Sequence, residues 1–345
     1  MTDRVFVENR LTQDVSLSRS GLTVGTPDLD RGLCIERHEG NLRAYDWNEW
    51  SEGRSLPALL QGTARAEAEE VLAGFEEAGE QALLMELASA LQMRGRERGA
   101  EHVDLQLRRV HQRVLTGPVD APLRDVRTWA IVELRVWVPA AGRTWDLWRC
   151  ASAPTVAKLH ARLPELVSLV ESMVDELAGG MPPVECPSEM LPVVFPPGAA
   201  SGSFFHELCG HPLEGDVVVR GGSYLARRRG ERVAADFVTI RDNPCAAPEV
   251  VTFARDDEGI AARPAVLIDA GRIAEPILDL ESAAALGLSS NGHARRVSFR
   301  HRALPRMTHT EVAPHSGTLE QLVASVERGL LIQHITPRHM DLLSG

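Results

Sequence analysis

In the segment AIVELRVWV, residues 130–138, every second side chain is apolar, and from Glu133 onward the side chains between them are polar or aromatic. This period of two is the pattern of a β-strand that turns one face toward a core. Residues 102–107, HVDLQL, alternate in the same way, and residues 144–150 form a third candidate strand after the turn signal Gly142. Together these segments predict an antiparallel meander.

Helical patterns flank this meander on both sides. Residues 63–93, TARAEAEEVLAGFEEAGEQALLMELASALQM, are rich in Ala, Glu and Leu, with apolar positions at helical spacing. They predict one or two helices, broken near Gly74 or Gly79. Residues 156–178 return to helical spacing and stop before Gly179. Two further candidate strands surround a turn at residues 39–41: residues 34–37 and residues 42–47.

A cluster of Gly and Pro, GGMPPVECPSEMLPVVFPPG at residues 179–198, marks the best domain boundary. We therefore predict an α+β protein with an N-terminal domain of antiparallel meander and helices, residues 1–185, and a C-terminal β-rich domain, residues 186–345. The elements expected in the second domain are strands at Val250–Phe253, Ala265–Ile268 and Val297–Arg302, a hairpin turn at Asp269–Arg272, and a helix at Leu319–Arg328.

Composition narrows the class of protein. The 345 residues suit two domains, and 44% hydrophobic with 25% charged residues is ordinary for a soluble protein. A net charge of −11 disfavours nucleic-acid binding. The basic run Arg227–Arg232 is a local exception, either a solvated surface or an anchor for acidic groups.

Cysteine use and the absence of apolar runs favour the cytosol. The five cysteines are an odd number without a CxxC pair, so no disulfide framework is expected. The N-terminus lacks a secretory pattern, and no apolar stretch is long enough to cross a bilayer. We therefore expect a cytoplasmic protein that does not bind membranes.

The chemistry is concentrated in residues 201–216, SGSFFHELCGHPLEGD. His206 and His211 flank Glu207 in an HExxxH pattern. Neutral imidazoles are good ligands for zinc and similar divalent ions, and a catalytic site adds a third ligand and an open position for water. Glu207 is suited to take a proton from that water.

The spacing of the two histidines predicts an irregular backbone. Five residues rotate by about 140° on an ideal α-helix, which would splay the two rings. A π-type turn brings residues i and i+5 onto one face, and Gly210 and Pro212 favour such a distortion. The carboxylates of Glu214 and Asp216 either orient the histidine rings or lie exposed.

Residues 201–216 resemble the HEAVGHxLEGD signature of the TldD/PmbA peptidases. The resemblance continues in DDEG at residues 256–259, in residues 283–306, and in RMTHT at residues 306–310, where His309 replaces the usual Asn. It ends with a helix near residues 319–330. It implies a cytosolic metallopeptidase of the HExxxH-containing catalytic type, acting on unfolded peptides as a homodimer or as a heterodimer with a related subunit. On the positions that match, His206 and His211 would hold the metal, zinc by expectation, and Glu207 would be the base.

One departure from the family concerns the third metal ligand. The family supplies a cysteine in a CGKxGQ-like segment near its C-terminus, and this sequence contains none, so the C-terminal domain is expected to be incomplete. Either another residue completes the site, or a separate chain does, or the protein is a weakened relative that serves as an interaction subunit. The candidate substitutes are Cys209, His293, His309 and His334.

Three arginines in the family-like block have two interpretations. Arg295, Arg296 and Arg306 can clamp a peptide carboxylate or stabilise an oxyanion. Alternatively they form structural ion pairs with the acidic run at residues 256–258. A peptide can also add as a strand to an exposed sheet edge.

Overall fold

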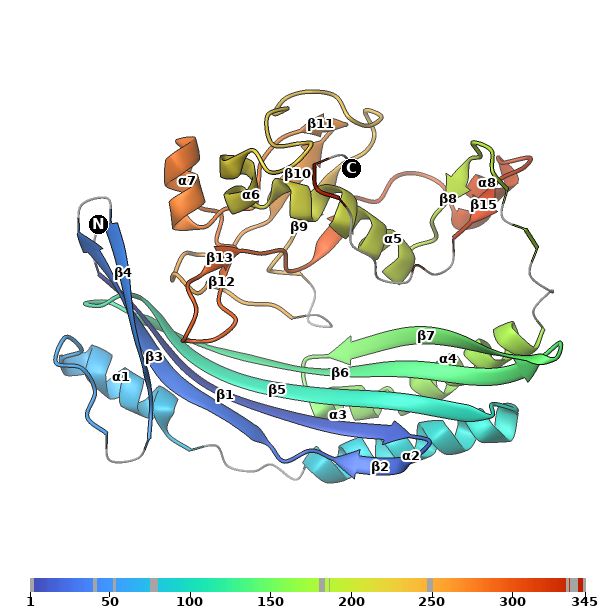
Figure 1. Cartoon of the computed structure of the whole chain (residues 1–345), viewed down its shortest axis with the longest axis horizontal. Helices are drawn as coiled ribbons and strands as arrows, with labels where there is room; N and C mark the ends of the chain where they lie inside the picture. The colour runs from blue at the N-terminus through green and yellow to red at the C-terminus, as the bar shows by residue number, and fades with distance from the viewer. Residues whose placement is uncertain are drawn as a thin grey trace.

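The computed structural model describes residues 3–39, 42–51, 54–74, 80–179, 184–185, 187–246, 251–332, 335 and 341–343. It is an α+β fold, as expected, in which a large antiparallel sheet carries helices on one face and the C-terminal half of the chain on the other (Figure 1). None of the helices in the described ranges combines the length and apolar character needed to cross a bilayer.

Seven strands of the described chain form the N-terminal sheet, in the order β4-β3-β1-β5-β6-β7 with β2 paired to β1. The predicted meander is confirmed as β5-β6-β7, although β5 and β6 are longer than their alternating cores. The predicted strands near residues 34–37 and 42–47 are confirmed within β3 and β4. The strands are β1 Arg4–Ser18, β2 Gly21–Val24, β3 Asp28–Glu39, β4 Leu42–Glu49, β5 His102–Pro118, β6 Leu123–Ala140 and β7 Arg143–Ala153.

The helices pack on one face of this sheet because each presents an apolar stripe to it. The predicted helical region splits in two, with one helix ending at Leu72 and the next beginning at Glu80; Gly79 lies outside the described residues. Leu84, Leu87 and Leu91 meet Val132 and Leu134 of β6 in the larger core. The helices are α1 Gly62–Leu72, α2 Glu80–Arg98, α3 Val156–Ala161 and α4 Leu163–Ala178.

The C-terminal half is built from short elements around a small sheet. Among the described residues this sheet has the order β11-β10-β9-β14, and β12-β13 and β8-β15 form two further pairs. The predicted hairpin at Asp269–Arg272 is confirmed between β10 and β11. The strands are β8 Val193–Val194, β9 Ile240–Asp242, β10 Ala265–Asp269, β11 Arg272–Ile273, β12 Ala294–Arg295, β13 Leu304–Pro305, β14 Thr310–Val312 and β15 Leu330–Leu331. The helices are α5 Ala199–Phe205, η1 His206–Gly210, η2 His211–Leu213, α6 Gly215–Arg220, α7 Leu280–Leu286 and α8 Leu319–Ala324.

Two predicted strands were wrong. Residues 297–302 form a turn, closed by the bond from His301 N to Ser298 O, and Phe299 N donates to the Glu8 carboxylate. Residues 251–253 are irregular, and Val250 lies outside the described residues. The last helix is also shorter than expected and ends at Ala324 rather than Arg328. At residues 297–302, the hydrogen bond from Phe299 N to Glu8 of β1 takes the place of the strand pairing that the local pattern predicted.

Buried charged groups join the two halves of the chain. Arg127 of β6 lies 2.6 Å from Asp257, both of them buried, and Arg296 lies 3.4 Å from Glu36 of β3. Three nearby carboxyl groups stay protonated to a higher pH than usual, because burial disfavours their charged forms. Burial raises the pKa of Glu8 to about 7, of Asp256 to about 7 and of Glu258 to about 8. The domain boundary near residue 186 stays a prediction.

Candidate metal centre

The predicted irregular turn is confirmed at the HExxxH segment. Helix α5 runs into a π-helical turn, η1, which is followed at once by the 3-10 turn η2. The His211 N–H donates to the His206 carbonyl, five residues back. Gly210 packs closely at this turn, since a Cβ there would lie 1.8 Å from the Met307 sulfur. Met307 is itself buried in the C-terminal core.

The π-turn brings the two imidazoles to the same side. The ring centroids of His206 and His211 lie 4.8 Å apart, at an angle of 82°. One ligand atom each from His206, Glu207 and His211 lies within 4.8 Å of the others. Within the described part of the chain, this is the one group of three or more His, Cys, Asp or Glu side chains that converge in this way. All three are half-buried, so the group is accessible from solvent.

His206 is supported from a distant strand. Its Nδ1 lies 3.4 Å from the Thr310 hydroxyl of β14, which in turn lies 3.2 Å from Asp242 Oδ1 of β9. Burial lowers the pKa of His206, and the neighbouring His211 lowers it further. The neutral ring that a metal requires is therefore favoured.

His211 is supported locally. Its Nδ1 lies 3.4 Å from Glu214 Oε1, and this nearby carboxylate raises the pKa of His211. Glu214 is buried, and its other oxygen lies 3.0 Å from Arg306. Of the two carboxylates considered from sequence, Glu214 orients a histidine, whereas Asp216 pairs with Arg220 at 3.0 Å.

These residues fit a divalent cation. Both Nδ1 atoms face oxygens, which leaves both Nε2 atoms for a metal, the arrangement seen at most histidine sites. Two ligands bonded at about 2.1 Å can lie at most about 4.2 Å apart, so the side chains must close by a few tenths of an ångström.

The substitute ligands considered from sequence do not join this group. Cys209 points into the C-terminal core, and burial raises the pKa of its thiol to about 12. His293 is fully buried with its Nε2 3.2 Å from Asp242. His309 stays outside the converging group, and His334 lies outside the described residues.

The three arginines have partners other than those expected. Arg296 pairs with Glu36 and Arg306 with Glu214, while Arg295 donates to the Met307 carbonyl at 3.0 Å. The side chain of Asp257 is instead held by Arg127 of the N-terminal sheet, which no local pattern indicates.

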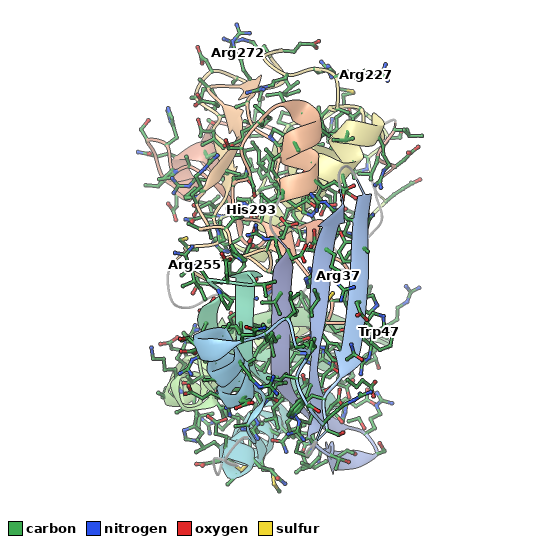
Figure 2. All side chains as sticks on the ribbon, turned by 90° about the vertical axis from the view of Figure 1, so that its left-hand side faces the viewer. Arg37, Trp47, Arg227, Arg255, Arg272 and His293 are labelled. Carbon is green, nitrogen blue, oxygen red and sulfur yellow. The ribbon has the colours of Figure 1, made fainter. Side chains whose placement is uncertain are left out.

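The basic run Arg227–Arg232 makes its own polar contacts. Figure 2 shows Arg227, together with Arg272, at the outer surface of the C-terminal half. Arg228 pairs with Glu231 at 2.8 Å, and Arg272 donates to the Gly230 carbonyl at 3.0 Å. These contacts are typical of a solvated surface loop.

Sequence reasoning missed Thr310 and Asp242. Thr310 stands within the RMTHT segment, which was a usable signal. No sequence signal pointed to Asp242, which lies 36 positions after His206. It comes close to His206 because β9 and β14 are paired, with Thr310 opposite Asp242.

Comparison with known proteins agrees with the resemblance of the sequence motifs. Residues 188–345 match the family model described as the PmbA/TldA metallopeptidase C-terminal domain. A metalloprotease TldD homolog of Haemophilus influenzae is 33% identical over 162 residues, 47% of this chain and 33% of the relative. A zinc metalloprotease TldD homolog of Saccharolobus solfataricus is 31% identical over 165 residues, 48% of this chain and 36% of the relative. The aligned region thus spans about a third of each curated relative.

Solved structures extend the likeness of the fold over almost the whole chain. A putative modulator of a DNA gyrase from Thermotoga maritima has a TM-score of 0.76 at 15% identity, covering 97% of this chain and 79% of its own. TldE from Thermococcus kodakarensis has a TM-score of 0.74 at 15% identity, covering 97% and 80%. Residues 188–345 thus match the PmbA/TldA metallopeptidase C-terminal domain and resemble TldD homologs, while the chain as a whole shares the fold of these solved structures.

Proposed function

We propose that this protein is a metal-dependent peptidase that hydrolyses unstructured peptides, with His206 and His211 as metal ligands and Glu207 as general base. The observation that carries the proposal is the π-turn, which gathers these three side chains within 4.8 Å. Relatives named as metalloproteases support the reaction class, and one named a zinc metalloprotease supports zinc as the ion.

Each residue has a distinct role. When bound, the ion polarises the scissile carbonyl and lowers the pKa of a water. His206 and His211 hold their ring positions through Thr310 and Glu214. Glu207 lies beside the imidazoles, where its carboxylate accepts the proton of the attacking water and then donates it to the leaving amine.

An extended peptide can reach this site along a sheet edge. Strand β14 ends the small sheet, and its Thr310 lies 3.4 Å from His206. A peptide that adds to β14 as a further strand would place its backbone beside the histidines. Such addition requires a chain without its own hydrogen-bonded structure, which favours unfolded peptides as substrates.

A second candidate is a non-catalytic or weakened interaction subunit of a heteromeric TldD/PmbA-type peptidase. It is favoured by the absence, among the described residues, of a third histidine or cysteine in the converging group. A solved neighbour is TldE, so we propose association with a related subunit, or with a second copy of this chain, in the cytoplasm.

Metal analysis and peptide cleavage separate these candidates. Purified wild type, Glu207→Gln and His206→Ala are compared for bound metal and for cleavage of an unstructured fluorogenic peptide. We expect Glu207→Gln to keep its metal and to lose activity by about 10²–10⁴-fold, and His206→Ala to lose both. A folded wild type that binds no divalent metal would sink the peptidase proposal. Metal binding without cleavage, with stable capture of a related subunit, would favour the interaction subunit.

A further inference from the structure

A line of polar side chains runs from His206 into the interior of the C-terminal half. Thr310 Oγ1 lies 3.4 Å from His206 Nδ1 and 3.2 Å from Asp242 Oδ1. Thr310 and Asp242 are direct partners in the pairing of β14 with β9. The backbone pairing therefore sets the position of both side chains relative to the histidine.

Donor and acceptor rules fix the direction of these bonds. A carboxylate only accepts, so the single hydroxyl proton of Thr310 is donated to Asp242. The Thr310 oxygen can then only accept from His206, whose Nδ1 must carry the hydrogen. The lone pair of His206 is left on Nε2, the atom free to bind a cation.

Asp242 is fully buried and held on its other side. Its Oδ2 accepts from Thr308 N at 2.8 Å and lies 3.2 Å from His293 Nε2. The His293 Nδ1 faces two oxygens of Asn291, at 3.1 and 3.0 Å, and therefore donates. Asn291 is oriented by its own bonds to Leu278 N and to the Pro276 carbonyl. Figure 2 shows His293 on the inner side of the C-terminal half, away from the outer surface marked by Arg227 and Arg272.

We infer that Thr310 and Asp242 are positioning residues for His206, which fix the ring tautomer that presents Nε2 to the metal. This inference rests on the proposed function, in which His206 is a metal ligand. Thr308 N donates to Asp242 Oδ2 and keeps that carboxylate in place from the far side. The two histidine rings are thus oriented differently. His211 contacts the carboxylate of Glu214 directly, whereas His206 is linked to the carboxylate of Asp242 through the Thr310 hydroxyl.

The chain offers an internal control for the loss of a hydroxyl. Thr308 lies two residues before Thr310, and its buried Oγ1 has no hydrogen-bond partner within the described structure. Thr308→Val and Thr310→Val are therefore the same chemical change in the same segment. Only the second removes a bond to His206.

The test measures zinc affinity of the full chain by competition with a chromophoric chelator. Loss of such a supporting group weakens metal binding by about 10–100-fold, so we expect this for Thr310→Val. Thr308→Val and Thr310→Ser should bind like wild type, since each keeps a hydroxyl at position 310. Asp242→Asn, checked for folding by its urea midpoint, should weaken binding in the same direction as Thr310→Val.

A second measurement needs no metal. The ¹⁵N shifts of His206, assigned by their loss in His206→Ala, report which ring nitrogen carries the hydrogen. We expect an Nδ1–H ring in wild type and in Thr308→Val, and a mixed population in Thr310→Val. Unchanged shifts, or wild-type zinc affinity in Thr310→Val, would overturn the positioning role alone. A wild type that binds no zinc while showing the expected shifts would instead count against the metal-dependent peptidase.

Discussion

Gly210 offers the sharpest test of how the π-turn is held. A Cβ built at this position lies 1.8 Å from the Met307 sulfur. Non-bonded heavy atoms settle at about 3.5 Å or more, so the sulfur of a Gly210→Ala variant must move by roughly 1.7 Å. Met307 is 6% exposed and packs in the core beside Cys209 and Leu213, so it can yield only by displacing neighbours.

Two opposing terms set the expected magnitude. Overpacking of a well-filled core costs about 1–3 kcal/mol. The backbone at Gly210 has helical angles, φ −65° and ψ −67°, and there Ala is favoured over Gly by about 0.5–1 kcal/mol. We therefore expect Gly210→Ala to lower the free energy of unfolding by about 1–2 kcal/mol. Zinc should also bind more weakly, because His211 follows directly.

The assay is urea unfolding of three variants, Gly210→Ala, Met307→Ala and the double variant, beside one control variant. Met307→Ala makes room for the new methyl group, so the double variant should lose less than the sum of the two single losses, by about 0.5–2 kcal/mol. Gly202→Ala in α5 is the control, since a Cβ there meets nothing within 4 Å. Equal midpoints for the two Gly→Ala variants, with additive losses in the double variant, would refute the steric account of the turn.

Three further predictions concern the buried charges and the second histidine. Arg127→Met leaves the buried Asp257 carboxylate without its partner and should lower the free energy of unfolding in urea by about 3–5 kcal/mol. The control Arg108→Met breaks an exposed pair with Asp14, 2.7 Å apart, and should cost less than about 1 kcal/mol. Equal losses in the two variants would contradict this prediction. The pKa values of Glu8, Asp256 and Glu258 are raised in the folded protein, so these groups keep protons there that the unfolded chain releases above about pH 4.5. The free energy of unfolding should therefore fall as the pH rises toward 8. Glu258→Gln should flatten that fall between pH 7 and 9, and a slope equal to that of wild type there would count against it. Glu214→Gln replaces the carboxylate partner of His211 and should weaken zinc binding by about 10–100-fold in chelator competition, without shifting the ¹⁵N signals of the other histidine.

Patterns that depend on neighbouring residues were predictable from sequence. Alternation at residues 130–138 gave the correct strand, and the five-residue spacing of His206 and His211 gave the π-turn. The same local logic failed at residues 297–302, where Val297 is 72% exposed and Phe299 is fully buried against β1 and β5. Contacts with another part of the chain overrode a pattern that looked like a strand.

The surroundings of the site were only partly predictable, for the same reason. Glu214 follows His211 by three residues, so a local pattern could propose it. Asp242 and Thr310 lie in strands far from the motif, and only their pairing brings a carboxylate behind His206. No periodicity encodes that contact, because it depends on how β9 and β14 align.

The two histidines therefore depend on different parts of the fold. His211 and Glu214 lie within one continuous turn of chain, so their geometry follows from the backbone of η1 and η2. His206 depends on a sheet whose edge strand, β14, is three residues long and has one described partner, β9. Elements with few buried contacts open locally more readily than well-packed ones, and no residue of β14 is fully buried. If a peptide substrate adds to β14, it would hold that strand in place and with it the Thr310 hydroxyl behind His206. Substrate binding and the orientation of His206 would then be coupled through a single strand.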